Sequence, residues 1–338
     1  MAAAANNIMR YLYRGEEGEF IPHEATHITV AEDAIFVRAR AFIWHRKIIE
    51  VILHDNVEKI EESAFAYCIS LRRVIMPGVK EVEHFAFCEC KALTDVEWDK
   101  LEIIGRHAFR QCYLRSINLP SASIVNEKAF SECKLLTEVK FSSQLQRVDK
   151  GVFFRCPSLE RITLPLNDFI FTYSNNDVFE ACHNLVHADL VGGEMHQFIA
   201  ALQLEEWRND INEEIDLINQ ILPNADWVRK TVKISWWISS VITHLDYYEA
   251  EHRKLMKEAT TLLELALWKA NLSGNEGQVK GVPTTRGRRK RARKEIFCEM
   301  PGVDVVIKNV LPFLVTPSTG GGARREKNMV MGRLRQFL

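Results

Sequence analysis

Six cysteines recur along the chain at a nearly constant interval, and thiols can bind metal ions or react with oxidants. Successive members are 22, 22, 21, 23 and 26 residues apart. A metal site needs ligands that converge on one point, commonly two cysteines separated by about two to four residues. The observed interval instead places one thiol on each unit of a repeat. We therefore predict a structural ladder of buried thiols and no cofactor: Cys68, Cys90, Cys112, Cys133, Cys156 and Cys182.

The alternative of metal or redox chemistry depends on a few other residues. Cys88 and Cys90 form a C-x-C pair, which is a weak motif because Cys88 lies outside the ladder. His45 stands where the first unit would carry its cysteine, and it fits a terminal repeat better than a metal ligand. Cys298 stands alone. The start, "MAAAANNIMRYLYRGEEGEF", has no apolar core of signal-peptide length, so we expect reduced thiols and a cytoplasmic or nuclear location.

The elements that position the thiols follow the same period. A phenylalanine precedes each cysteine by three residues, and in nearly every unit a valine or isoleucine stands five residues before that phenylalanine. In the sixth interval an insertion, "LNDFIFTYSNND", lengthens the spacing and brings Ser174 to the aliphatic position, which predicts a distorted coil or a protruding loop there. The phenylalanines are Phe42, Phe65, Phe87, Phe109, Phe130, Phe153 and Phe179.

Each unit also contains a short strand with alternating apolar residues, and several strands end at a proline. One unit is too small to bury its own apolar side, but stacked units cover one another. We therefore predict an α/β leucine-rich-repeat solenoid, right-handed, with a parallel sheet on the concave side and short helices on the convex side, followed by an α-helical hairpin. The inward pairs are Val51 and Leu53, Val74 and Met76, Val96 and Trp98, Ile117 and Leu119, Val139 and Phe141, Ile162 and Leu164, and Ala188 and Leu190.

The unit core, Ala64-Phe65 followed by Cys68 and Leu71, resembles the BspA-type leucine-rich repeat. The resemblance covers about residues 26 to 192. Segments such as "VEKIEESAF" and "RRVIMPGVKEVEHFAF" are similar to leucine-rich repeat domain-containing proteins of diatoms, and "LEEWRNDINEEID" and "DVVIKNVLPFL" extend that similarity toward the C-terminus. The resemblance implies a fold rather than an activity.

Residues that alternate with the inward pairs should form the outer surface of the sheet, with Arg73 beside Asp95 on neighbouring strands. A mixed polar and laterally extended surface suits a protein partner, although the same charges could simply keep the surface solvated. Asp95 and Glu97 are not accompanied by the nucleophile, base and orienting group that catalysis requires, so we expect no enzyme. The candidate partner-binding residues are Glu50, Arg73, Ile75, Asp95, Glu97, Asn118, Glu138, Lys140, Arg161, Thr163, His187 and Asp189.

After Gly192 the apolar period changes to that of a helix. We predict one helix that Pro223 ends and a second from about Trp227 to Ala270. The simplest role for this hairpin is to cap the open end of the solenoid. The alternative is an arm for self-association or for a partner, because the second helix is longer than the first.

The net charge of the 338 residues is −1, but one short run between 286 and 294 is strongly basic. Three roles are open for this run: binding to a nuclear import receptor, neutralisation of phosphates, or a solvated linker with no dedicated partner. Nucleic acid is the weaker partner, because no aromatic residue lies between the charges to stack on bases. No stretch is apolar enough to predict a membrane span. The basic residues are Arg286, Arg288, Arg289, Lys290, Arg291, Arg293 and Lys294.

The expected organisation is a series of six segments. It comprises a lead-in or cap at 1–25, a solenoid of about seven repeats at 26–192, a helical hairpin at 194–270, a basic disordered linker at 271–295, a short apolar segment at 296–316 and a disordered tail at 317–338. The leading function is a non-enzymatic scaffold or adaptor that binds a protein on the concave face, and the alternative is a nuclear protein that contacts nucleic acid through the linker.

Overall fold

The computed structural model describes residues 8–171, 177–191, 205–226 and 229–275. It divides into two compact units, one formed by Met1–Gly193 with Asn212–Ile242 and the other by Glu194–Ile211 with Thr243–Leu338. The first unit contains the solenoid and the helical residues that close one of its ends.

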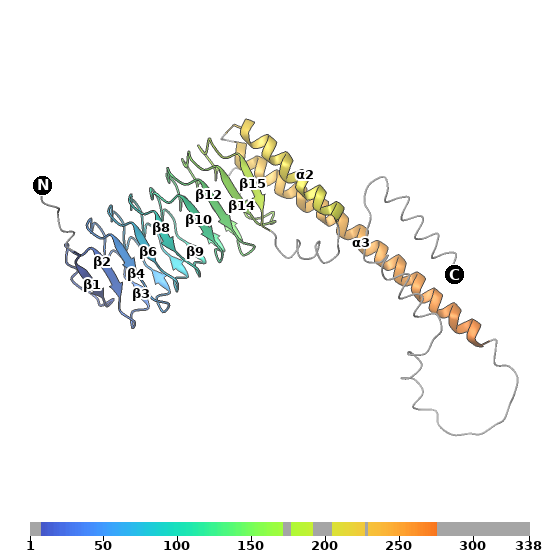
Figure 1. Cartoon of the computed structure of the whole chain (residues 1–338), viewed down its shortest axis with the longest axis horizontal. Helices are drawn as coiled ribbons and strands as arrows, with labels where there is room; N and C mark the ends of the chain where they lie inside the picture. The colour runs from blue at the N-terminus through green and yellow to red at the C-terminus, as the bar shows by residue number, and fades with distance from the viewer. Residues whose placement is uncertain (1–7, 172–176, 192–204, 227–228, 276–338) are drawn as a thin grey trace, which may run out of the picture. The chain divides into compact units, whose positions relative to one another are not determined.

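The predicted strands form two parallel sheets (Figure 1). Their order in space follows the order in the chain, as expected when each repeat lies on the one before it. The first sheet consists of β1 (Arg10–Tyr13), β2 (His27–Val30), β4 (Glu50–Ile52), β6 (Arg73–Ile75) and β8 (Asp95–Glu97), and the second of β10 (Ser116–Leu119), β12 (Glu138–Phe141), β14 (Arg161–Leu164) and β15 (His187–Leu190).

A further parallel sheet of two-residue strands was not predicted. It contains the aliphatic residues found five positions before the phenylalanines, and all six of these residues are buried. Each strand of this sheet pairs with the equivalent strand of the neighbouring coil, so the backbone is bonded between coils on this side as well. The strands are β3 (Phe36–Val37), β5 (Lys59–Ile60), β7 (Glu81–Val82), β9 (Ile103–Ile104), β11 (Ile124–Val125) and β13 (Arg147–Val148).

The short helices predicted for the convex side are wrong, because the residues around each phenylalanine form turns. In the coil of Phe65, Ser63 and Tyr67 have left-handed φ angles of 56° and 63°. The Phe65 N–H donates to Ala86 O of the next coil at 2.7 Å, and the Tyr67 N–H donates to Cys88 O at 2.8 Å. An α-helix would direct these donors to its own preceding turn. Bonding between coils therefore replaces helical bonding on this side.

The core of the solenoid is a column of phenylalanine rings. Six successive ring pairs from Phe42 to Phe179 are stacked, with centroids between 4.8 and 5.9 Å apart. Tyr13 continues this column at the N-terminal end, 5.0 Å from the Phe42 ring. All seven phenylalanines are fully buried, so the column forms a continuous apolar axis through the coils.

The first and second sheets meet at Trp98. In the coil that begins the second sheet, one residue separates Cys112 from Leu114, whereas two separate the equivalent Cys68 and Leu71. The shorter loop coincides with the end of the first sheet at β8. Trp98 Nε1 donates to Asn118 O at 2.7 Å, and the Trp98 ring meets the Phe109 ring edge-on at 5.2 Å. A side chain thus links the two sheets where the backbone ladder is interrupted.

The insertion in the sixth interval changes the register of the chain. Phe171 forms a β-bridge with Val148. Phe171 thus occupies the position that the repeat spacing assigned to Ser174, a residue outside the described part of the chain. Asp168 and Phe169, just before it, are exposed. Phe171 follows Val148 by 23 residues, an ordinary interval, but precedes Phe179 by eight residues where other coils have five, so the extra residues of the insertion fall between Phe171 and Phe179.

The helices are α2 (Glu205–Ile221), a 3₁₀ turn at Leu222–Asn224 and α3 (Lys230–Asn275). The second helix thus begins and ends a few residues later than predicted, and residues 194–204 of the first lie outside the described part. In the part of the chain that the structure describes, neither helix contains an apolar window long enough to span a bilayer.

The helical residues of the first unit close the solenoid, as the capping hypothesis predicted. In interior coils the phenylalanine N–H donates to a carbonyl of the next coil, as Phe153 does to Val178. In the last coil the Phe179 N–H donates to Thr231 Oγ1 at 3.3 Å, and the Ala188 N–H of β15 donates to Asn219 Oδ1 at 2.9 Å. Lys230 is buried and donates to two carbonyl oxygens of the last coil, those of His183 at 2.9 Å and Leu185 at 2.6 Å. Side chains of the cap therefore occupy hydrogen-bonding positions that another coil would fill.

In the second unit the two helices are also bonded to each other. Tyr248 donates its hydroxyl proton to the carboxylate of Asp210. Among the side chains of α3 that the structure describes in this unit, Tyr247, Leu265 and Trp268 are large, apolar and exposed.

Candidate partner-binding face

The predicted partner-binding residues lie on the outer surface of the two longer-stranded sheets, which we call the strand face. The strand registers align its side chains in rows that cross the strands. In the first sheet one row is mostly charged, and the next row is mostly apolar until its last member. The charged row is Arg10, His27, Glu50, Arg73 and Asp95, and the second row is Leu12, Thr29, Ile52, Ile75 and Glu97.

Arg73 is the electrostatic centre of the first sheet. Its guanidinium lies 2.8 Å from Glu97, 3.4 Å from Asp95 and 3.5 Å from Glu50. The predicted pair of Arg73 and Asp95 is therefore present, in the register expected. The hydrogen bond to Glu97, together with the neighbouring carboxylates, raises the pKa of Arg73. One cation faces three carboxylates, which leaves this group of four residues with two negative charges in excess.

The excess charge is exposed at the β8 end of the first sheet. The side chains of Asp95 and Glu97 are 60% and 53% exposed, whereas that of Glu50 is 25% exposed. In the second row, Leu12 and Ile52 are 50% and 38% exposed. An apolar row thus leads across the strands to a pair of accessible carboxylates.

The second sheet is electrically balanced. Lys140 lies 3.1 Å from Glu138, and Arg161 lies 2.9 Å from Asp189. Its registers place Ser116 and Asn118 at the edge next to the first sheet, and Thr163 and His187 among the charged pairs. All twelve predicted residues therefore belong to one face, but the two sheets divide them into an acidic set and a neutral set.

Two residues of later strands, Ile52 and Ser116, were not among the twelve predicted residues, and the first two strands, with Arg10, Leu12, His27 and Thr29, were missed in the sequence. These first two strands precede the first phenylalanine of the repeat, so the period gave no reason to include them. The alternation in "RYLY" and "HITV" could have identified both strands.

The cysteine ladder lies inside the solenoid. The seven cysteines described are buried and free of disulfides. Each ladder thiol donates to the carbonyl oxygen of the phenylalanine in the preceding coil. These sulfur-to-oxygen distances lie between 3.0 and 3.2 Å for Cys68 to Phe42, Cys90 to Phe65, Cys112 to Phe87, Cys133 to Phe109, Cys156 to Phe130 and Cys182 to Phe153.

Burial raises the pKa of five ladder thiols, those of Cys68, Cys90, Cys112, Cys156 and Cys182, and so favours their protonated form. It raises the pKa of Cys182 to about 12, and it raises the pKa of Cys90, Cys112 and Cys156 well above the usual range. Cys88, beside the ladder, has its pKa raised to about 11 for the same reason. Metal ligands and nucleophiles need the thiolate form, so this environment opposes both roles. Within the described ranges, no group of three or more His, Cys, Asp or Glu side chains is placed to hold a metal ion.

His45 performs the bonding role of a cysteine in the first coil. It is buried, and its Nε2 lies 3.3 Å from the carbonyl oxygen of Ile21 in the preceding segment. Its ring also stacks on His23 at 4.9 Å. The substitution of histidine for cysteine thus preserves the contact to the preceding backbone.

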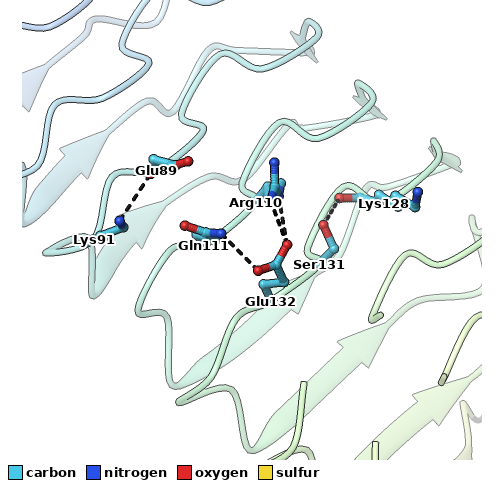
Figure 2. Close-up of polar contacts among 7 residues, drawn as sticks. All are labelled: Glu89, Lys91, Arg110, Gln111, Lys128, Ser131 and Glu132. Atoms are coloured by element: carbon cyan, nitrogen blue, oxygen red, sulfur yellow. Dashed lines mark hydrogen bonds and ion pairs between the residues drawn. The ribbon is translucent and has the colours of Figure 1, made fainter. Parts of the chain in front are cut away.

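The surface formed by the phenylalanine-flanking turns, which we call the turn face, carries a second polar cluster (Figure 2). Figure 2 shows Arg110 and Gln111 directed at Glu132 of the next coil. Arg110 donates from Nε and Nη2 to one carboxylate oxygen at 2.9 and 2.8 Å, and Gln111 Nε2 donates to the other at 2.9 Å. Glu89 pairs with Lys91 at 3.1 Å in the same view.

The turn-face cluster is satisfied internally. Partial burial opposes ionisation of Glu132, but the bonds from Arg110 and Gln111 prevail and lower its pKa. Both carboxylate oxygens are already occupied by donors from the neighbouring coil. This cluster therefore fastens two coils together, and it offers less free charge to a partner than Asp95 and Glu97 do.

The predicted basic run from Arg286 to Lys294 and the segments around it lie outside the described residues. An import receptor and a nucleic acid contact therefore stay predictions. Self-association through the helical hairpin also stays a prediction.

The repeat region matches a known family model. Residues 35–102 and 80–193 match the BspA type leucine rich repeat region, in six copies. The chain carries a BspA-type leucine-rich repeat region. Solenoids of this kind present laterally extended surfaces of the sort that bind proteins. No curated protein sequence is significantly similar to the chain.

Among solved structures, the chain is similar to a leucine-rich repeat protein from Bacteroides ovatus, at 20% identity and a TM-score of 0.42, over 51% of this chain and 48% of that one. It is also similar to a T. pallidum leucine rich repeat protein, at 22% identity and a TM-score of 0.36, over 49% of this chain and 70% of that one. The BspA-type chain thus spans about half the length of the Bacteroides protein.

Proposed function

We propose that the BspA-type solenoid is a non-enzymatic protein-binding scaffold that uses its strand face. The observation that carries this proposal is the pair of rows that cross five strands in register, one mostly charged and one mostly apolar up to its last residue, Glu97. A partner that lies across the strands contacts several coils at once, which suits a protein surface or an extended segment.

The internal bonding of the turn face supports the choice of the strand face. Glu132 is saturated by donors from Arg110 and Gln111, whereas the first sheet has an excess of accessible carboxylates and exposed aliphatic side chains. Protein interfaces combine apolar contact with charges that select the partner.

The proposal is tested by affinity capture with matched charge reversals. One variant reverses Arg73, Asp95, Glu138 and Arg161 together. The control exchanges Arg110→Glu with Glu132→Arg on the turn face, which keeps opposite charges side by side. We expect partners captured by the unaltered chain to be lost with the strand-face variant and kept with the control, while circular dichroism shows both folded. Partners that survive the strand-face reversal contradict the proposal.

A further inference from the structure

The first sheet of the strand face has a chemistry more specific than a general protein surface. We infer that it binds an extended segment whose aliphatic residues are followed by lysine or arginine. This inference rests on the proposed function and names the class of partner. It follows from the order of the side chains along the second row and from the charge at the end of that row.

The apolar part of the site spans four strands. Leu12, Thr29, Ile52 and Ile75 follow one another in register, and three of these four residues are aliphatic. Leu12 and Ile52 are exposed although both are aliphatic. Side chains of this kind gain free energy when a partner removes them from water.

The charged part of the site lies at the last strand. Glu97 ends the apolar row, and Asp95 ends the charged row beside it. Arg73 contacts both carboxylates, but it also contacts Glu50, so one guanidinium is shared among three acids. A cationic residue of a partner would offset the remaining negative charge, whereas an acidic residue would add to it.

The break between the sheets defines the end of this site. Beyond β8, the next strand presents the neutral residues Ser116 and Asn118, and the following charges are paired with one another. The four strand intervals from β1 to β8 span about 19 Å, since neighbouring strands are about 4.8 Å apart. An extended peptide of about six residues covers that length at about 3.3 Å per residue. A seven-residue probe is therefore sufficient.

The test uses the full chain and four synthetic peptides, followed by fluorescence anisotropy. The lysine probe is Leu-Ser-Leu-Ser-Leu-Lys-Lys, and two comparison peptides replace both lysines with glutamate or with glutamine. A fourth peptide keeps the lysines and replaces the leucines with serine. We expect the lysine probe to bind most tightly, by about fivefold over the glutamine peptide. Raising the salt concentration should reduce that difference.

Variants of the chain locate the binding. Asp95→Asn with Glu97→Gln should remove the preference for lysine, and Ile52→Ser with Ile75→Ser should weaken all leucine-containing peptides. Glu138→Gln with Asp189→Asn makes the same chemical changes on the second sheet and should leave the affinity unchanged.

Three outcomes would overturn the inference: equal or tighter binding of the glutamate peptide, lysine-probe binding that is insensitive to the first-sheet variants, and no binding of any probe. The capture experiment distinguishes these results from failure of the scaffold proposal. If captured partners still depend on the strand face, the function stands and only the chemistry assigned to the partner is wrong.

Discussion

The thiol of Cys112 donates a hydrogen bond to the carbonyl oxygen of Phe87, and the sulfur and oxygen atoms are 3.2 Å apart. The two residues belong to neighbouring coils, so one contact joins the ladder of thiols to the column of phenylalanine rings. The same relationship recurs for all six ladder cysteines. Each of these cysteines therefore has a structural role, because its thiol connects two successive coils.

Replacing Cys112 with alanine should destabilise the first unit by about 1–2 kcal/mol, because the variant loses a buried contact and leaves a small cavity. Denaturant unfolding followed by circular dichroism measures the change in the free energy of unfolding. Ser116→Ala, an exposed position on the following strand, is the control and should change stability by less than about 0.5 kcal/mol. Equal effects at the two positions would contradict a structural role for the thiol.

Alkaline pH should destabilise the solenoid through its buried thiols. Burial raises the pKa of Cys182 from the ordinary 9.0 to about 12, so between these values the unfolded chain loses a proton that the folded chain retains. Stability from this group is present below pH 9 and decreases as the pH rises. Between pH 8.5 and 10.5 the loss is about 2 kcal/mol for one thiol.

The Cys182→Ala variant isolates that contribution. Its free energy of unfolding should fall less over the same pH interval, by about 2 kcal/mol, than that of the unaltered chain. The comparison of slopes is independent of any constant loss of stability caused by the substitution. Parallel pH dependences in the two proteins would show that this thiol ionises equally in both states.

Lys230→Met should loosen the last coil, because it removes the donor shared by the His183 and Leu185 carbonyl oxygens. An unsatisfied buried carbonyl costs about 1–3 kcal/mol. Hydrogen exchange should accelerate in β15 more than in β4, which lies far along the stack. Lys233→Met, on the same helix, is the control and should leave the exchange of β15 unchanged. Uniform acceleration along all coils would count against a local cap.

Trp98→Phe should weaken the junction between β8 and β10. Phenylalanine keeps an aromatic ring against Phe109 but lacks the Nε1 donor to Asn118, so we expect a loss of about 1 kcal/mol. Trp98→Ala should cost about 3–5 kcal/mol because it also empties the ring's place in the core. Chemical denaturation of both variants separates the hydrogen bond from the packing. Equal losses of stability in the two variants would contradict separate contributions from the hydrogen bond and from the packing of the ring.

Gly151→Ala should destabilise the turn face. Gly151 has a φ of +64°, and an added Cβ would lie 3.2 Å from Lys128 Cγ. A left-handed conformation costs a non-glycine residue about 1–2 kcal/mol. Ala181 adopts a φ of 60° in a later coil, so Ala181→Gly is the inverse experiment and should be neutral or slightly stabilising. In thermal unfolding, the melting temperature should therefore fall for Gly151→Ala and should stay unchanged or rise slightly for Ala181→Gly.

The sequence predicted the features that every coil repeats. The alternation of Val74 and Met76 identified a strand and its inward face, and the spacing of Cys68 identified a ladder of thiols. The pairing of Arg73 with Asp95 followed from the register of equivalent strands. Each of these inferences needed only the period and the alternation of apolar residues.

The features that depend on bonding between coils could not be predicted in the same way. Ser63 and Tyr67 are ordinary residues, and nothing in their type reveals a left-handed φ that is stabilised by hydrogen bonds to the next coil. The missing residue before Leu114 is visible in the sequence, but it does not reveal that the first sheet ends at β8 or that Trp98 donates a hydrogen bond across the junction. The cap contacts of Thr231 and Asn219 join positions far apart in the chain, where no periodic signal connects them.

The cap also bears on how a protein of this type can change in evolution. Thr231 and Asn219 accept hydrogen bonds from the last coil where a further coil would offer backbone oxygens. The cap therefore requires only the shared backbone geometry of the repeat, not the identity of the coil beneath it. Duplication or loss of a whole repeat before the cap would leave this closure intact. The number of repeats therefore sets the length of the strand face, and with it the size of the partner that the face accommodates.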